Sequence, residues 1–311
     1  MSVAVDEEER RRLLGVAYRM LGSLHDAEDA VQEGLVRWEQ LGPDGRAQVR
    51  EPAAWLTTVV SRVCLDALGS ARARRERYTG VWLPEPVPGA AGFGGAALVG
   101  GALGPAPGPD PADVVTLEES VSLALLVAME QLSAAERVAL ILHDAFGTPF
   151  DDVAEVVGRT PQACRQLASS ARRHLRAQPR YAASGPERDA VVAAFARACE
   201  DGDLEALARV LDPGVVVRSD GGGVVSAARR PVEGGEKVAR FVLGLFAKQA
   251  ATGVPATVAA EPVNGRTGLV VHVGGVVAAV VDLAVADGAI REIAVVVAPD
   301  KLALWRAAPP A

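Results

Sequence analysis

Residues 148–180, TPFDDVAEVVGRTPQACRQLASSARRHLRAQPR, contain the pattern that decides the fold of the middle of this chain. Apolar residues recur at helical spacing over 150–157, and Gly158 marks the end of this first helix. Thr160 suits the N-cap of a second helix, and Pro161 suits its first position, where the missing N–H costs nothing. The stretch therefore predicts a helix-turn-helix.

The second predicted helix combines an apolar stripe with a polar, basic face. No acidic residue follows Glu155 until Glu187, so arginines determine the charge of this face. A basic surface with short polar side chains near the helix start is typical of a helix that contacts DNA. The alternative is an ordinary helical hairpin with a solvated arginine face.

Composition limits the classes of protein that fit the chain. Its 311 residues exceed one ordinary domain; half are hydrophobic, only 4% are aromatic, and the formal net charge is −7. An acidic chain is not a general nucleic-acid coat, so nucleic-acid contacts require local basic surfaces. The three cysteines lie far apart without a C-x-x-C pair, which predicts structural thiols and no metal site.

The sequence shows no sign of export or membrane insertion. No apolar segment follows the charged residues 6–12, so we expect no signal peptide. The valine-rich segments near 269–285 are interrupted by Gly274, Gly275 and Asp282. We therefore expect a cytoplasmic protein with no membrane contact and no cofactor.

The first eighty residues carry helical patterns with opposite charges. A helix beginning after Ser23 has an acidic outer face, and a helix opening at Pro52 leads into arginines near residue 75. Opposite charges indicate two different partners. Residues 42–45 are expected to form a loop between them, and Trp55 is expected to pack in the core, with stacking on a flipped base as the alternative.

The composition changes after the first helices and again near residue 186. Residues 87–111 are almost entirely Gly, Ala and Pro, which cannot bury enough surface to order themselves. Beyond 186 we expect helices at 187–200, 203–211 and 236–246 and strands near 256–261, 267–273, 276–284 and 289–297. Gly- and Asn-containing turns between the strands predict an antiparallel meander, and therefore an α+β domain.

The order of acidic helix, basic helix, flexible linker and helix-turn-helix resembles the bacterial extracytoplasmic-function sigma factors of the sigma-70 family. The string at 26–33 resembles the region-two motif that docks on the clamp helices of RNA polymerase. Residues 52–77 resemble the part of region two that melts and reads the minus-ten element. Residues 150–176 resemble region four, which reads the minus-thirty-five element.

The C-terminal part resembles the SnoaL-like fold, an α+β cone of the nuclear-transport-factor-2 type. Sigma factors with this fused tail share the string WLPEP at 82–86, the turn DGGG at 220–223 and a near-terminal Asn-Pro-Asp-Lys-Leu, whose asparagine is Ala298 here. The resemblance implies a multidomain protein with two all-α sigma domains and this tail. The implied boundaries are region 2 at 1–80, a flexible linker at 81–112, region 4 at 113–180 and a SnoaL-like regulatory domain at 186–311.

The resemblance implies three sets of functional residues and no catalytic or metal-binding residue. The polymerase-binding set is Asp26, Glu28, Asp29, Gln32 and Glu33. The DNA-binding set is Arg62, Arg72, Arg74, Arg75, Arg77, Gln162, Arg165, Gln166, Arg172, Arg173 and Arg176. The interdomain set is Trp82, Leu83, Pro84, Asp220, Gly221, Gly222, Gly223, Asp300, Lys301 and Leu302. In region four, Arg165 and the two glutamines are expected at base edges and the other arginines at phosphates.

The implied function is a sigma factor that directs core RNA polymerase to promoter DNA, with a tail that regulates it in cis. The alternative is a DNA-binding regulator whose tail is a small-molecule sensor or an enzyme, since enzymes occur in the SnoaL-like fold. Polar residues available for such a pocket are Arg218, Asp220, His272 and Asp282. A tail interior filled with valine and leucine, which the sequence favours, would argue for the regulatory domain. A simple repressor fits less well, because it needs no acidic docking face.

Overall fold

The computed structural model describes residues 6–76, 78, 80–89, 123–176 and 185–307. The chain forms two compact units. The helical unit comprises residues 1–76, 93–121 and 125–178, and the sheet unit comprises residues 77–92, 122–124 and 179–311. The chain therefore first enters the sheet unit after residue 76 and returns to it for the whole C-terminal part.

The first part of the helical unit is a small helical bundle. Its helices are α1 (Glu7–Leu21), α2 (Leu24–Gln40), α3 (Gly42–Gln48) and α4 (Pro52–Glu76). Ser23 caps α2 by accepting a hydrogen bond from the backbone N–H of Asp26, as its position predicts. Met20, Trp38 and Val60 are almost completely buried in the core. The prediction of a loop at 42–45 is wrong, because these residues form the start of α3, with a proline in its first turn.

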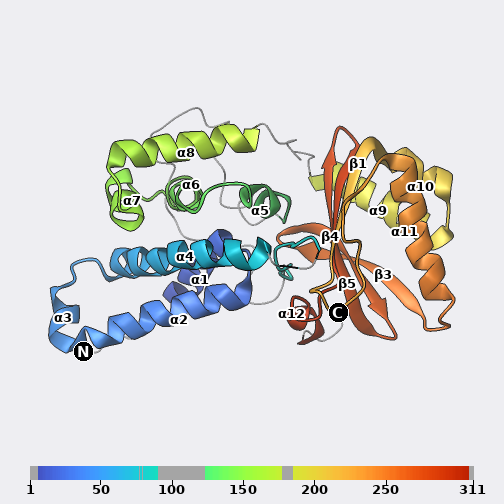
Figure 1. The fold of residues 1–311 in the computed structure, drawn as a ribbon. Coiled ribbons are helices and arrows are strands. Elements are labelled where there is room, and N and C mark those ends of the chain that lie inside the picture. The colour runs from blue at the N-terminus through green and yellow to red at the C-terminus, as the bar shows by residue number, and fades with distance from the viewer. Residues whose placement is uncertain (1–5, 77, 79, 90–122, 177–184, 308–311) are drawn as a thin grey trace. The chain divides into compact units, whose positions relative to one another are not determined.

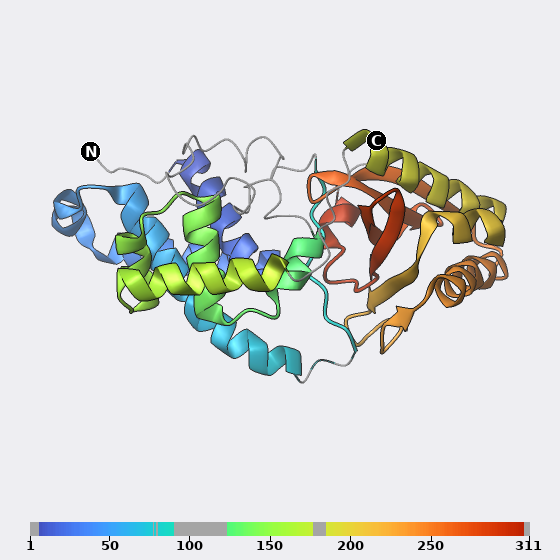
Figure 2. The ribbon, with the colours of Figure 1, turned by 90° about the horizontal axis from the view of Figure 1, so that it is seen from above.

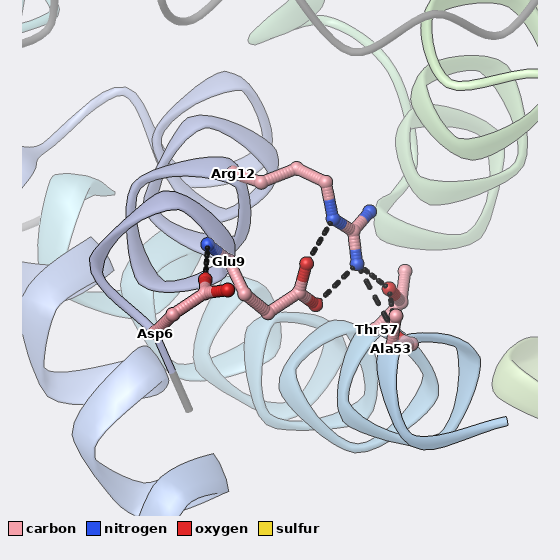
Figure 3. A network of polar contacts seen from close by, with 5 residues as sticks. All are labelled: Asp6, Glu9, Arg12, Ala53 and Thr57. Carbon is pink, nitrogen blue, oxygen red and sulfur yellow. Dashed lines mark hydrogen bonds and ion pairs between the residues drawn. The ribbon is translucent and has the colours of Figure 1, made fainter. Parts of the chain in front are cut away.

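A polar network joins α1 to α4 (Figure 3). Arg12 donates two hydrogen bonds to the carboxylate of Glu9, at 2.8 and 2.7 Å, and reaches Thr57 Oγ1 at 2.6 Å. Asp6 caps α1 by accepting from the N–H of Glu9 at 2.8 Å. The N-terminal turn of α1 is thereby fixed against α4, the helix that leads toward the predicted basic segment.

The second part of the helical unit contains the predicted helix-turn-helix. The helices of this part of the chain are α5 (Leu123–Met129), α6 (Ala134–Leu140), a π-helical turn (Ile141–Ala145), α7 (Phe150–Val157) and α8 (Pro161–Arg176). Gly158 ends α7 in the left-handed conformation with φ 69°, which a side chain would strain. Thr160 Oγ1 accepts from the N–H of Ala163 at the start of α8. Both helix ends therefore form as the sequence predicts.

The two groups of helices pack against each other inside the helical unit. Arg62 of α4 donates to the backbone carbonyl of Glu155 on α7, with its Nη2 at 2.8 Å. The guanidinium of the fully buried Arg19 lies 5.4 Å from the centroid of the Phe146 ring. Burial lowers the pKa of Arg19 to about 10. The helices of the two expected sigma domains are thus joined in one body.

The sheet unit contains one six-stranded sheet and four helices among its described residues. The helices are α9 (Gly185–Asp201), α10 (Leu204–Val210), α11 (Gly235–Ala250) and α12 (Ala303–Ala307). The strands are β1 (Leu211–Asp220), β2 (Val232–Glu233), β3 (Ala256–Val263), β4 (Arg266–Val273), β5 (Val276–Ala286) and β6 (Ala289–Val296), in the order β2-β1-β6-β5-β4-β3. The meander from β3 to β6 is antiparallel as expected, while β1 pairs with β6 in parallel and was not expected.

Both faces of the sheet are covered. One face packs on α9, α10 and α11 through a cluster of buried apolar residues that includes Phe195, Leu283 and Ile293. On the other face, the register partners Val270, Val280 and Val296 are also buried, at 0–1% exposure. Figures 1 and 2 show α12 and residues 80–89, which we call the strap, on the side opposite α9–α11. The strap is therefore a structural layer of the sheet unit.

Candidate functional site

The outer face of α2 presents the expected acidic residues to solvent. Glu28, Asp29, Gln32 and Glu33 are exposed and Asp26 is half-buried in the first turn. Beside them is a shallow surface depression lined by residues of α2 alone: Gln32, Leu35, Val36, Glu39 and Gln40. The helix therefore offers carboxylates next to the exposed apolar side chain of Val36, a combination suited to a basic and apolar partner.

The basic end of α4 is described only in part. The backbone of α4 includes Arg72, Arg74 and Arg75, but their side chains and the whole of Arg77 lie outside the described residues. Arg62 is exposed, yet its guanidinium is engaged with the carbonyl of Glu155. Trp55 is half-buried and packs on Trp38, with ring centroids 5.3 Å apart, in agreement with a packing role.

The exposed face of α8 carries most of the residues expected to contact DNA. Gln162, Arg165, Gln166 and Arg173 are exposed. On the opposite face, Cys164, Ala168 and Ala171 are completely buried. The side chain of Arg176 lies outside the described residues. The amphipathic pattern is therefore realised as a solvated, basic helix face.

Arg172 was expected to contact phosphate, but in the structure its side chain forms an ion pair within the helical unit. Its Nε and Nη2 donate to the two carboxylate oxygens of Asp144 at 2.8 and 2.7 Å. The two side chains are only 11% and 1% exposed. A bidentate pair has a fixed geometry, and removal of one partner of a buried pair is destabilising because it leaves the other charge uncompensated. Arg172 thus ties α8 to the π-helical turn.

In the sheet unit, a buried carboxylate joins three distant segments. Asp220, at the end of β1, accepts hydrogen bonds from the hydroxyl of Tyr78, the N–H of Leu83 at 2.8 Å and the N–H of Gly222 at 2.9 Å. Lys301 Nζ lies 2.7 Å from the same carboxylate and also donates to the carbonyl of Leu83 at 2.5 Å. We call these five residues the Asp220 cluster. It brings the expected strings at 82–86, 220–223 and 300–302 into contact.

Electrostatic interactions stabilise the observed arrangement of the Asp220 cluster. Burial and the bond to Asp220 raise the pKa of Tyr78, so the phenol remains a donor. The ammonium of Lys301 lies 4.3 Å from the centroid of the Trp82 ring, within cation–π range. The cation is therefore satisfied by a carboxylate, a carbonyl and an aromatic face at once. Among the other expected residues, Pro84 and Leu302 are buried and Asp300 is exposed.

Glycine is required in the turn that follows Asp220. A Cβ on Gly221 would lie 2.1 Å from the carbonyl oxygen of Val225, so no other residue fits without backbone movement. Gly222 and Gly223 have φ of 68° and 72°. The turn directs the N–H of Gly222 to the carboxylate of Asp220. The role of this turn is therefore structural.

Two further contacts hold the strap and were missed by sequence reasoning. Asn264 accepts from the N–H of Val87 at 2.9 Å and donates its own N–H to the carbonyl of Val87 at 2.8 Å. Trp305 Nε1 donates to the carbonyl of Pro86 at 2.8 Å. A lone tryptophan near the end of a chain poor in aromatics was the available signal for the second contact. Asn264 was recognised only as a turn residue.

Three of the polar residues considered for a catalytic pocket, Arg218, Asp220 and Asp282, form ion pairs within the sheet unit. Arg218 forms an ion pair with Glu292. Asp282 forms a buried pair with Arg188 at 2.7 Å. His272 lies half-buried on β4, opposite Thr257 and Val277. Within the described residues, no group of three or more His, Cys, Asp or Glu side chains could hold a metal ion.

The three cysteines are buried, as expected of structural thiols. Burial raises the pKa of each thiol, to about 12 for Cys199. The reactive thiolate is therefore disfavoured.

No helix in the described part of the chain has the length and apolar character needed to cross a membrane.

Comparison with known proteins identifies the family of the chain. The model of Sigma-70 region 2 matches residues 6–74 and that of Sigma-70, region 4 matches residues 122–175. The ECF RNA polymerase sigma factor SigJ of Mycobacterium tuberculosis (strain ATCC 25618 / H37Rv) is 42% identical over 247 residues, covering 79% of this chain and 73% of SigJ. This chain belongs to the ECF RNA polymerase sigma factors.

Relatives of this sigma factor also match its sheet unit. The probable ECF RNA polymerase sigma factor SigI of Mycobacterium tuberculosis (strain CDC 1551 / Oshkosh) is 38% identical over 301 residues, covering 96% of this chain and 93% of SigI. The crystal structure of SigJ matches with a TM-score of 0.71 and 34% identity, over 94% of this chain and 95% of that one. The chain is thus a transcription initiation factor rather than an enzyme, with two helical sigma regions and a sheet-containing C-terminal domain.

Proposed function

We propose that this sigma factor directs core RNA polymerase to promoter DNA and that its C-terminal domain, a SnoaL-like tail, regulates this activity in cis. The observation that supports the regulatory part of this proposal is that the Asp220 cluster holds the strap. The strap lies in sequence between the two regions that match sigma-70 models, and Asp220 and Lys301 of the tail bind its backbone. A tail that holds this connection influences how the two regions are arranged.

The proposed contact with core polymerase is the acidic face of α2. The supporting observations are the exposure of Asp29 and Glu33 and the exposed apolar side chain of Val36 on the same helix. Charge complementarity mainly accelerates association and fixes register, while apolar contacts supply much of the affinity. Asp29, Glu33 and Val36 recur at helical spacing, so they lie on one side of α2, where a single partner surface would meet them together.

The proposed DNA contacts are those of α8 that remain exposed. Gln162, Arg165 and Gln166 are proposed at base edges, and Arg173 at phosphate. Arg172 is omitted because its guanidinium is held by Asp144. The arginines at the end of α4 are proposed to hold phosphates near the melted duplex, on the strength of the sequence alone.

The interior of the tail argues for a regulatory domain over a sensor or enzyme. The space between the sheet and α9–α11 is packed with aliphatic and aromatic side chains, including Val192, Phe195 and Leu207. The polar residues Arg218 and Asp282 are paired with neighbouring side chains. A ligand-binding interpretation needs convergent unpaired polar groups around a cavity.

The test of the polymerase contact is a pull-down with purified core polymerase. The variant Asp29→Lys with Glu33→Lys should lose most binding, because two carboxylates of the docking face become cations. The control, Asp189→Lys with Glu200→Lys, makes the same charge change at exposed positions of α9 and should bind as the unmodified chain does. Equal binding by both folded variants would contradict the proposal.

A further inference from the structure

A short aromatic column lies beside the exposed face of α8. The His143 ring stacks on the Phe150 ring, with centroids 3.8 Å apart and planes inclined by 27°. The guanidinium carbon of Arg165 lies 5.5 Å from the centroid of the same Phe150 ring, within cation–π range. These three side chains, from the π-helical turn, α7 and α8, form what we call the aromatic column.

The base of the aromatic column is fixed by the backbone before α7. His143 Nδ1 lies 3.0 Å from the carbonyl oxygen of Thr148; since a carbonyl oxygen only accepts, this nitrogen carries a proton. The carbonyl of His143 accepts from the N–H of Gly147 at 3.0 Å, and the N–H of Thr148 donates to the carbonyl of Leu142 at 2.9 Å. The turn thus orients the His143 ring, and the stacked Phe150 ring is oriented with it.

The geometry points to Phe150 as a positioning residue for base reading by Arg165. Arg165 is exposed beside Gln162 and Gln166 on α8. A long arginine side chain gives up rotamer freedom when it binds a base edge. A ring that already restricts the guanidinium reduces this loss, so the contact discriminates between bases more sharply. The inference rests on the proposed DNA contact of Arg165 and adds a residue that acts through it.

The experiment measures base preference in a randomised minus-thirty-five library, using core polymerase reconstituted with each full-length variant. Arg165→Ala should reduce the preference at one base pair by about 5- to 150-fold, as for loss of a bidentate contact. Phe150→Leu should weaken the preference at that same base pair by about two- to fivefold. It should leave the other positions and the salt dependence unchanged. Phe150→Tyr retains the ring and should restore the preference.

Two controls separate positioning from a purely structural role. Val157→Ala shortens another side chain of α7 without removing a ring and should not alter the preference profile. Phe150→Leu added to Arg165→Ala should change the profile no further. Loss of preference at all positions in Phe150→Leu, or the same profile in Val157→Ala, would overturn the inference. An unchanged profile in Arg165→Ala would instead refute the proposed DNA contact of Arg165, and the inference with it.

Discussion

The carboxylates of α2 and the carboxylate of Asp220 occupy opposite environments in the same protein. Asp29 is 72% exposed and Glu33 is 50% exposed at the side chain. Asp220 is completely buried at the side chain and meets an ammonium, a phenol and two backbone N–H groups. An exposed carboxylate keeps its hydration and contributes little to stability, whereas a buried carboxylate replaces water with protein donors.

This difference separates binding from folding. The acidic face of α2 is free to change partners, because its removal leaves no buried group unsatisfied. The Asp220 cluster is committed to one arrangement of the strap, because loss of any member leaves charged or polar groups in a dry site. The same residue type therefore supports recognition in the helical unit and tail assembly in the sheet unit.

The largest expected effect on stability comes from Asp220→Ala. The change strands the Lys301 ammonium, which is 8% exposed, and removes the acceptor for Leu83 and Gly222. We expect a loss of about 3–5 kcal/mol in the free energy of unfolding of the sheet unit, as for other broken buried pairs. Amide hydrogen exchange under native conditions should show faster exchange over residues 81–89. Unchanged exchange there would show that the cluster does not hold the strap.

Lys301→Met should have a smaller effect than Asp220→Ala. Asp220 keeps three donors in this variant, so the carboxylate remains partly satisfied. A loss of about 2 kcal/mol is expected for a hydrogen bond to a charged group. The order of the two variants in urea unfolding is the decisive result. A larger loss for Lys301→Met would mean that the cation, and not Asp220, organises the cluster.

The smallest effect on stability is expected for Asp29→Lys with Glu33→Lys on α2. Exposed substitutions away from caps and buried networks change the free energy of unfolding by no more than about 0.5 kcal/mol each. The urea midpoint should therefore match that of the unmodified chain even where polymerase binding is lost. A marked drop in the midpoint would remove the distinction drawn between the two kinds of carboxylate.

Local sequence patterns predicted the elements that depend on local periodicity and turn chemistry. The helix-turn-helix and the strands β3 to β6 follow from apolar spacing, Gly158 and Gly-containing hairpins. The strand β1 was missed because Asp212, Pro213 and Gly214 interrupt its pattern, and the structure has a register shift there. Strand breakers inside a strand hide it from a periodicity argument.

For the strap, the sequence predicted which segments belong together but not the individual contacts between them. The resemblance indicated that the segments at 82–86, 220–223 and 300–302 belong together, but it did not give the bonds. Lys301 and Leu83 lie 218 positions apart, and no local periodicity connects residues at that separation. Asn264 and Trp305 were missed for the same reason. The ion pair of Arg172 was missed because a basic helix face and a buried pair use the same residue type.

Run-off transcription with purified core polymerase tests most directly whether the tail regulates the sigma factor in cis by holding the strap. Three proteins are compared: the full chain, a chain ending at Ala298, and a chain ending before residue 185. The second protein lacks Lys301 and Trp305, both of which bind the strap, while keeping all six strands of the sheet. If these contacts lower the fraction of the protein that is competent to bind polymerase, promoter output should rise when they are removed. Equal output from all three folded proteins would contradict the account.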